Sequence, residues 1–430
     1  MASELTSLAL LLFFGVAAAF GYADMQSQLT SQAEQHLRSG DAPGALTLLE
    51  KASAAPTTPS GEDRIGFLYA VAGHPDEATT HFRKAIHQDA HCASAHYHLG
   101  VLFWLAKNQD QGLPELQTAA RLEPANFDYR YHLGSAYVDL GDYDKAVPEL
   151  KAAIAKNPSR PEAWKELGIA QQRSNDLANA VASLAKAVEL NPKDDELRNG
   201  YADLLIATRQ PESAIEESQK ILAGNKSNVP ALLNIGHADL KMGEYAKAEL
   251  AYKELIAIES SNTAAHYDLG IALKMQDKIE EAQKEFTRAI QLDPSLVEAH
   301  YTLGITDWQL GDFPGTITEM KAAISQRPDY AAAHYMLGIA LKQSGDVDAS
   351  LLELKESIRL DPSTPGPFNT LGQLLRIKGD KQGSAEAFAT GARLKREKEA
   401  KMGSALEQGM RGGSNMPTPL ETPPMKPGPQ

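Results

Sequence analysis

The sequence predicts an all-α protein built as a stack of helix–turn–helix repeats. Two observations carry this prediction: small residues recur every 34 positions, and the apolar residues between them have helical spacing. The length of 430 residues would by itself suggest two or three globular domains. A regular period indicates instead a solenoid of many small units, each of which buries its apolar surface against its neighbours.

The period is set by two small residues and one large residue in each of ten units. Each unit has one residue at the first small position: Gly66, Gly100, Gly134, Gly168, Ala202, Gly236, Gly270, Gly304, Gly338 and Gly372. A second small residue follows twelve positions later, as in Ala78 or Ala146. Four positions further on lies a large apolar residue, except at Ser218: Phe82, Leu116, Leu150, Leu184, Tyr252, Phe286, Met320, Leu354 and Phe388. These separations place the residues on one helix face, so we predict two helices in close contact.

Turn and stop signals separate the predicted helices. Several units have a Gly-Asp pair between them: Gly141-Asp142, Gly311-Asp312, Gly345-Asp346 and Gly379-Asp380. Glycine adopts the left-handed conformation that ends one helix, and aspartate caps the start of the next. Proline ends the second helix in six units, at Pro124, Pro158, Pro192, Pro294, Pro328 and Pro362.

Segments 127–158 and 265–294 resemble the tetratricopeptide repeat, and we expect an exported protein of the bacterial type. Ten such units cover residues 59–398, and a degenerate unit covers 24–58, with its second helix at 40–52. The resemblance implies a right-handed superhelix in which the first helix of each unit lines the concave side. Unit 195–228 departs most from the pattern, with Ala202, Ser218 and Lys226, and we predict that it opens first.

The resemblance also implies which residues line the groove. In this family the fifth, ninth and twelfth positions of each unit face the concave surface. The predicted partner-binding groove therefore consists of Tyr97, Tyr131, Tyr267, Tyr301 and Tyr335 at position five and Trp104 and Trp308 at position twelve. The alternative is that tyrosine at position five is a general feature of the scaffold. The basic clamp that grips chaperone carboxylates in some family members is absent, because Lys165 has Ile169 at position nine.

Composition and motifs narrow the function classes. The formal charge is −14 and no basic stripe stands out, so we expect no nucleic-acid partner. A single cysteine, Cys92, excludes a disulfide framework. No nucleophile elbow, phosphate loop or dinucleotide fingerprint occurs, so we predict a non-enzymatic protein without a cofactor.

A histidine-rich segment is the one feature that suggests metal chemistry. Six histidines lie between residues 74 and 98, and Cys92 lies among them. His91, Cys92 and a neighbouring histidine could ligate a metal. However, His96 occupies the same repeat position as His266, His300 and His334, which have no cysteine nearby. We therefore predict no metal site. A metal site within residues 87–98 is the alternative.

The two ends of the chain carry different signals. An apolar run from Leu8 to Phe20, followed by Gly21 and Ala23, predicts a cleaved signal peptide at 1–23 and a periplasmic or secreted protein. Because Glu4 precedes the run and no basic residue does, a membrane anchor at 5–20 or a cytoplasmic apolar helix remains an alternative. At the other end, residues 399–430 predict a polar cap helix and a disordered proline-rich tail.

These expectations favour a protein–protein interaction scaffold that binds a partner segment in the concave groove. The alternative is a periplasmic accessory subunit that positions an enzyme or an envelope assembly machine, such as a glycosyltransferase, a peptidase or a secretion component.

Overall fold

The computed structural model describes residues 25–411, with side chains up to residue 402. The predicted signal peptide at 1–23 and the proline-rich tail from residue 412 lie outside the described residues. Within the described range the chain forms helices and no strand, and the all-α repeat architecture predicted from the period is confirmed.

Helical hairpins follow one another along the chain. The first described hairpin pairs residues 25–38 with α2 (Ala42–Ser53). The first helices of the ten following repeats are α3 (Pro59–Val71), α5 (Ala93–Leu105), α7 (Phe127–Asp139), α9 (Pro161–Arg173), α11 (Asp195–Ala207), α13 (Val229–Met242), α15 (Thr263–Lys274), α17 (Val297–Leu310), α19 (Ala331–Gln343) and α21 (Pro365–Ile377). The second helices are α4 (Pro75–Gln88), α6 (Gln109–Leu122), α8 (Tyr143–Lys156), α10 (Leu177–Leu190), α12 (Pro211–Gly224), α14 (Tyr245–Ile258), α16 (Ile279–Leu292), α18 (Phe313–Gln326), α20 (Val347–Leu360) and α22 (Lys381–Arg411).

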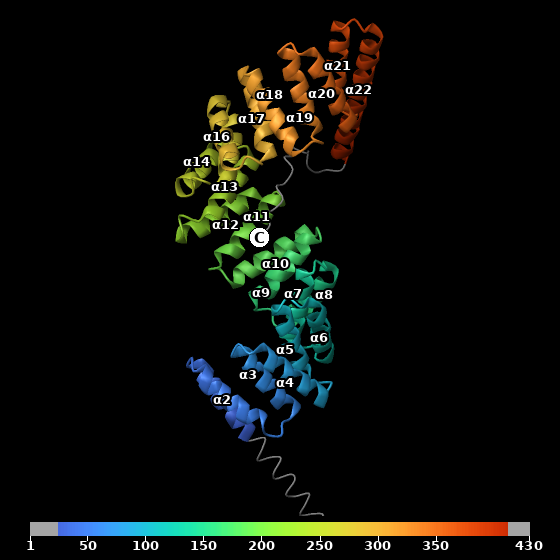
Figure 1. Ribbon diagram of the computed structural model, residues 1–430. Helices are drawn as coiled ribbons and strands as arrows, with labels where there is room; N and C mark the ends of the chain where they lie inside the picture. Colours follow the sequence, from blue (N-terminus) through green and yellow to red (C-terminus); the bar gives the residue numbers. More distant parts are fainter. Residues whose placement is uncertain (1–24, 412–430) are drawn as a thin grey trace, which may run out of the picture. The chain divides into compact units, whose positions relative to one another are not determined.

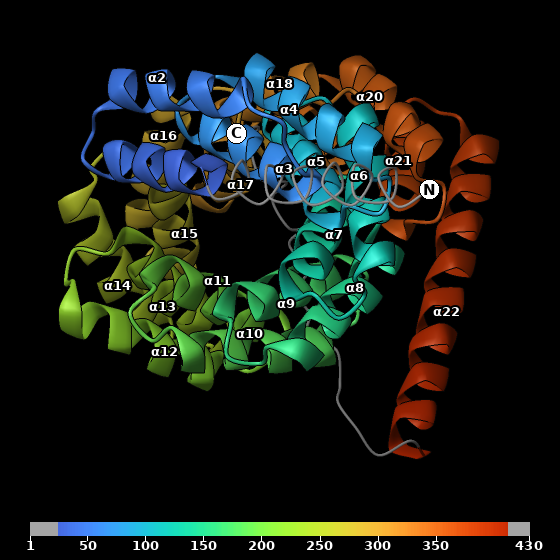
Figure 2. The same cartoon turned by 90° about the horizontal axis from the view of Figure 1, so that it is seen from below.

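The chain divides into two compact units, which we call the first unit (up to Ile221) and the second unit (from Leu222). Within each unit a second helix packs against its own first helix and against the first helix of the next repeat, as α8 does with α7 and α9. The first helices of successive repeats also touch, as α7 and α9 do in the first unit and α17 and α19 in the second. The order of the hairpins can be followed in Figure 1, and the same helices from below in Figure 2.

The predicted close contact of the two helices is confirmed, and its cause is the repeated glycine. A Cβ added at Gly134 would lie 2.7 Å from Leu150 Cγ, and one added at Gly270 would lie 2.5 Å from Phe286 Cε1. In repeat 195–228, both residues of this contact differ from the other repeats. Ala202 replaces the glycine, and the smaller Ser218 replaces the large residue. Both side chains are fully buried, so we interpret the exchange as a compensation in size.

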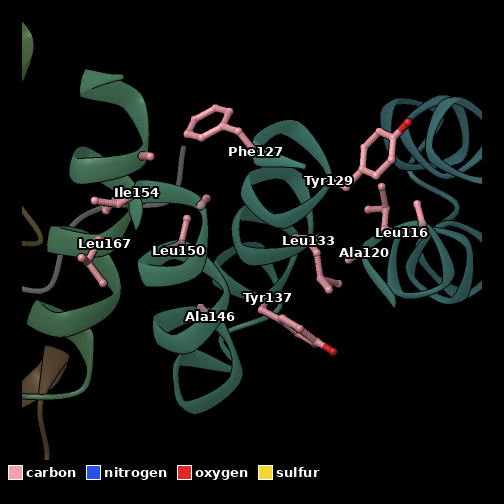
Figure 3. Close-up of a cluster of buried hydrophobic side chains, with 14 of the residues drawn as sticks. Leu116, Ala120, Phe127, Tyr129, Leu133, Tyr137, Ala146, Leu150, Ile154 and Leu167 are labelled. Atoms are coloured by element: carbon pink, nitrogen blue, oxygen red, sulfur yellow. The ribbon is translucent and has the colours of Figure 1, made fainter. Parts of the chain in front are cut away.

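Leucines from successive helices form the core of the first unit. Leu116, Leu133, Leu150 and Leu167, from α6, α7, α8 and α9, follow one another through this core, as Figure 3 shows. Each is at most 4% exposed. A hairpin alone would leave one side of these leucines in water, which is why the repeats must stack.

The turns between the two helices of a repeat share one conformation, whether or not they contain glycine. Gly311 has φ +80°, as predicted, and the Asp312 carboxylate accepts a hydrogen bond from the Gly315 amide at 2.9 Å. In four other repeats a non-glycine residue has a φ of 58° to 61°: Lys107, Asn175, Arg209 and Asp277. The turn is therefore imposed by the packing of the two helices as well as by glycine.

The final helix, α22, runs from Lys381 to Arg411 without interruption and includes the start of the segment 399–430, where a polar cap helix was predicted. None of the helices in the described part of the chain is both long and apolar enough to cross a membrane.

Candidate functional site

The candidate site is the surface formed by the first helices of successive repeats, which we call the first-helix face. Positions five, nine and twelve are separated by four and three residues, so their side chains lie on one side of each helix. All seven predicted groove residues are half-buried there: Tyr97, Trp104, Tyr131, Tyr267, Tyr301, Trp308 and Tyr335. The structure thus distributes them over both units, with Tyr97, Trp104 and Tyr131 in the first.

In the first unit, hydrogen bonds join position five of one repeat to position six of the next. The Asp63 carboxylate lies 2.8 Å from His98 Nδ1, and the Tyr97 hydroxyl lies 3.2 Å from His132 Nδ1. Both contacts link residues 35 positions apart, so they connect neighbouring first helices. The polar groups that were predicted to meet a partner are therefore partly engaged within the protein.

The other aromatic residues of the first unit are also in contact with neighbouring repeats. Trp104 Nε1 donates a hydrogen bond to the Asp139 carboxylate at 2.9 Å. The rings of Tyr97 and Tyr129 are 4.7 Å apart. Burial raises the pKa of Tyr97 and of Tyr131 to about 12, so both phenols are neutral at physiological pH.

In the second unit, Tyr267, Tyr301 and Tyr335 occupy position five of three successive repeats. The Tyr267 hydroxyl lies 3.4 Å from Thr302 Oγ1, and the Tyr301 ring lies 4.8 Å from the ring of Tyr330. Tyr335 lies against Gly366, where an added Cβ would come within 2.7 Å of its hydroxyl. Between these tyrosines and the end of each helix are the half-buried Ile271, Ile305 and Ile339 at position nine. This part of the face is mainly apolar and aromatic.

Position twelve of the second unit carries cations that our sequence analysis missed. The residues in four successive repeats are Lys274, Trp308, Lys342 and Arg376. Lys274 is half-buried, and this burial lowers the pKa of its ammonium group. Lys342 donates a hydrogen bond to the Gln373 side chain of the next repeat. The 34-residue period places these cations in register with Trp308, although the prediction for this position named only its tryptophans.

The histidine-rich segment is divided among separate contacts. His81 Nδ1 lies 2.5 Å from Glu62 on α3, His96 Nδ1 lies 2.5 Å from Glu115 on α6, and His98 faces Asp63. His91 and Cys92 lie in the turn before α5, as expected. Within residues 25–402, no three His, Cys, Asp or Glu side chains are grouped so as to hold a metal ion.

Position four forms a second contact that recurs through the repeats. The histidine Nδ1 faces a glutamate 19 residues later, and Nε2 faces a backbone carbonyl six residues earlier, in His96–Glu115, His266–Glu285, His300–Glu319 and His334–Glu353. Arg130 and Arg198 make equivalent pairs with Glu149 and Glu217. The assignment of His96 to a structural position is therefore confirmed, and its hydrogen bond to the Glu115 carboxylate raises its pKa.

Two of the surface hollows among the described residues lie away from the predicted groove residues. One of about 350 Å³ is lined by Thr80, Arg83, Lys84, His87 and Gln88 of α4. The other, of about 530 Å³, lies between the start of α10 and the end of α11. The candidate site is an extended face on successive first helices, which suits a chain segment better than a small molecule.

Comparison with known proteins supplies the family. Models of the tetratricopeptide repeat match residues 28–51, 65–127, 108–161, 131–195, 172–234, 229–262, 263–296 and 301–365, which together span more than half of the chain. No curated protein matches the chain.

Several solved structures are similar. MamA from Desulfovibrio magneticus RS-1 is 24% identical, with 39% of this chain and 96% of that chain covered and a TM-score of 0.38. YrrB, described as a tetratricopeptide repeat protein with an unusual peptide-binding site, is 22% identical, with 43% and 95% covered and a TM-score of 0.39. A tetratricopeptide repeat protein from Parabacteroides merdae ATCC 43184 is 18% identical, with 58% and 98% covered and a TM-score of 0.45.

The family matches agree in register with the helical hairpins and with the glycine contacts described above. This chain belongs to the tetratricopeptide repeat family.

Proposed function

We propose that this chain is a non-enzymatic scaffold that holds a segment of a partner protein on the first-helix face of its second unit. One observation carries the proposal: Tyr267, Tyr301 and Tyr335 recur in line on three successive first helices. They are half-buried, and so are the isoleucines at position nine. Such a row of accessible aromatic and aliphatic side chains is typical of a surface that buries a partner.

The chemistry of this row suits a peptide segment. Tyrosine offers a large apolar ring together with a hydroxyl that can bond to a peptide backbone. Burial raises the pKa of Tyr267 and Tyr301, so these hydroxyl groups keep their protons and remain donors at physiological pH. The hydroxyl of Tyr97 contacts His132 in the first unit, and that of Tyr267 contacts Thr302 in the second, so the units differ in their rows of tyrosines and not in this contact. We therefore prefer the second unit as the principal binding surface.

Site-specific cross-linking tests this proposal. A photoreactive amino acid replaces Tyr301 on the first-helix face, and a matched variant carries it at the exposed Lys321 on α18. In native cells, we expect a defined partner to be cross-linked from position 301 and not from position 321. Cross-linking of the same partner from both positions, or only from 321, would place binding on the second helices and contradict the proposal.

A substitution pair makes the test quantitative. Tyr301→Ala should weaken capture of the cross-linked partner about tenfold or more, because an aromatic anchor at an interface contributes on the order of 2 kcal/mol. Tyr245→Ala removes another half-buried tyrosine of the second unit, at the start of α14, and should leave capture unchanged. Equal effects of the two substitutions would show that the loss reflects stability and not binding.

We further propose that the protein is exported, on the basis of the apolar run from Leu8 to Phe20 and the small residues Gly21 and Ala23. N-terminal sequencing of the protein isolated from its native cell tests this. The expected first residue is Asp24. A chain that retains residues 1–23 would favour the anchor or the cytoplasmic alternative.

A further inference from the structure

The second unit carries a column of cations beside its tyrosines. Lys274, Lys342 and Arg376 occupy position twelve, seven residues after position five on the same helices. At 1.5 Å per residue, this places the cation column about 10 Å along the helix axes from the tyrosine column. Isoleucines 271, 305 and 339 lie between the two columns. The face is therefore apolar in its middle and positively charged along one edge.

The carboxylates of this face are already paired. Asp268 lies 2.9 Å from His237 Nε2, and Glu298 lies 2.7 Å from Arg327. Among the described residues, no carboxylate lies within ion-pair distance of Lys274, Lys342 or Arg376. A half-buried ammonium without a counter-ion is unfavourable, and for Lys274 this burial lowers the pKa. An incoming carboxylate would remove that penalty.

The cation column is specific to the second unit. The residues at position twelve in the full repeats of the first unit are Ala70, Trp104, Val138, Gln172 and Ile206, which carry no charge. The first unit has carboxylates on or beside its first-helix face instead, including Asp63 and Asp139. The whole chain has a formal charge of −14, so this positive edge differs in sign from the chain as a whole. Such a local positive charge would steer an anionic partner to this part of the face.

We propose that the segment held by the second unit is an acidic amphipathic peptide, with carboxylates that meet Lys274, Lys342 and Arg376 and apolar side chains that cover the tyrosines and isoleucines. This inference rests on the proposed function. Packed helices are about 10 Å apart, and an extended peptide rises about 3.3 Å per residue. Carboxylates about three residues apart would therefore reach successive repeats, and about six residues apart would bridge Lys274 and Lys342 past Trp308.

A pair of designed peptides probes the proposal directly. The acidic peptide is about 14 residues long, carries glutamates spaced by about six and then about three residues, and has valine and leucine between them. The basic peptide is identical except that lysine replaces each glutamate. Binding of each labelled peptide to the full chain is measured by fluorescence anisotropy at low and at high salt. We expect the acidic peptide to bind and to weaken as salt rises, and the basic peptide not to bind.

Two charge-reversal variants with the same net charge provide the control. One variant is Lys274→Glu, Lys342→Glu and Arg376→Glu. The other is Lys284→Glu, Lys321→Glu and Lys355→Glu, at exposed positions on α16, α18 and α20. The first should lose at least tenfold in affinity for the acidic peptide, and the second should remain within about twofold of the parent chain. A neutral variant with glutamine at 274, 342 and 376 should lose several-fold in affinity for the acidic peptide. It keeps the test valid if the charge-reversed variant misfolds.

Equal losses in the two reversal variants, or equal binding of the two peptides, would overturn the proposal. The proposed function fails in a different way, through absence of a partner cross-link from position 301. If that cross-link forms in the parent chain and persists unchanged in the variant with glutamate at 274, 342 and 376, the scaffold role stands and the acidic partner is rejected.

Discussion

The two units use the same hairpin to present different surfaces. In the first unit, the first-helix face is joined by internal hydrogen bonds, such as those of Asp63 with His98 and Tyr97 with His132. The second unit has a corresponding bond, between Tyr267 and Thr302. It also carries a row of tyrosines and isoleucines beside Lys274, Lys342 and Arg376. The contacts between glycine and the large residue are the same in both units. The core positions of the repeat thus constrain its shape, while the face positions vary independently and carry specificity.

The largest expected effect tests whether the two units are energetically separate. Phe286 in the second unit and Leu150 in the first are both fully buried. Phe286→Ala should reduce the free energy of unfolding by about 3–5 kcal/mol, and Leu150→Ala by about 2–5 kcal/mol. In hydrogen exchange, each substitution should lower protection mainly in its own unit, because repeat proteins couple through nearest neighbours. Equal loss of protection in both units after either substitution would contradict this separation.

A buried carboxyl distinguishes position eleven in the two units. Asp239 and Asp307 in the second unit are each 4% exposed. The full repeats of the first unit carry Tyr69, Phe103, Tyr137, Gln171 and Leu205 at this position. Burial raises the pKa of Asp307 to about 6, although a hydrogen bond from Gln283 opposes the shift. Because the folded pKa exceeds the unfolded value, the stability of the chain should fall as the pH rises from about 4 through about 6.

Asp307→Asn should reduce this pH dependence and raise the free energy of unfolding by on the order of 2 kcal/mol at neutral pH. Burial also raises the pKa of Asp239, so a dependence of the same sign should remain. The measurement is urea unfolding between about pH 4 and pH 8. Asp329→Asn, at an exposed site of the same repeat, controls for the change in net charge. A pH profile unchanged by the Asp307 substitution would show that the carboxyl is not the cause.

A pH dependence of the same sign, in a higher pH range, is expected from His96 in the first unit. The hydrogen bond that His96 donates to the Glu115 carboxylate raises the pKa of His96, against the effect of burial. Its contribution to stability is therefore complete below about pH 6.5 and disappears as the pH rises through the folded pKa. Glu115→Gln should cost about 1 kcal/mol at low pH and less above neutrality. A cost that grows with pH would reverse this interpretation.

The smallest expected effect concerns repeat 195–228, which contains the boundary between the units. Ser218 is fully buried and its hydroxyl has no hydrogen-bond partner within the described part of the chain. Ser218→Leu alone should overpack against Ala202, whereas the double change with Ala202→Gly restores the pattern of the other repeats. A double-mutant cycle should give a favourable coupling of about 1 kcal/mol.

The same repeat is predicted to open first, and the double variant offers a way to measure this. Hydrogen exchange in 195–228 should be faster than in 263–294 in the parent chain and slower in the double variant than in the parent. Faster exchange in 263–294 would contradict the assignment of the weak repeat.

The repeat architecture could be predicted from sequence because its signal is local and recurs. Gly134 and Leu150 lie within one hairpin, and ten repetitions of the pattern exclude coincidence. The turns at Lys107 and Arg209 could not be predicted in the same way, because these residues do not ordinarily favour a positive φ, whereas the Asn175 and Asp277 side chains tolerate it better. Packing of the two helices holds them in that conformation.

The candidate site was predicted only in part. All seven aromatic residues lie on the first-helix face as half-buried side chains, but their role in binding stays a prediction. The bond between Tyr97 and His132 could not be foreseen, because it depends on how two first helices are rotated against each other. The cations at position twelve can be read from the sequence with the 34-residue period. Whether they are available to an anionic partner depends on which carboxylates are already paired within the protein.

The sequence by itself determined the hairpin, its length and the residues at its internal contact, because each depends on separations within one repeat. Tertiary structure decided which polar groups are paired and which remain available. His96 and Glu115 are 19 residues apart, Asp63 and His98 are 35 apart, and neither pairing follows from helical spacing alone. Stacking of whole hairpins brings such groups within hydrogen-bond distance, and the surface left unpaired by that stacking, around Lys274, is where recognition is expected.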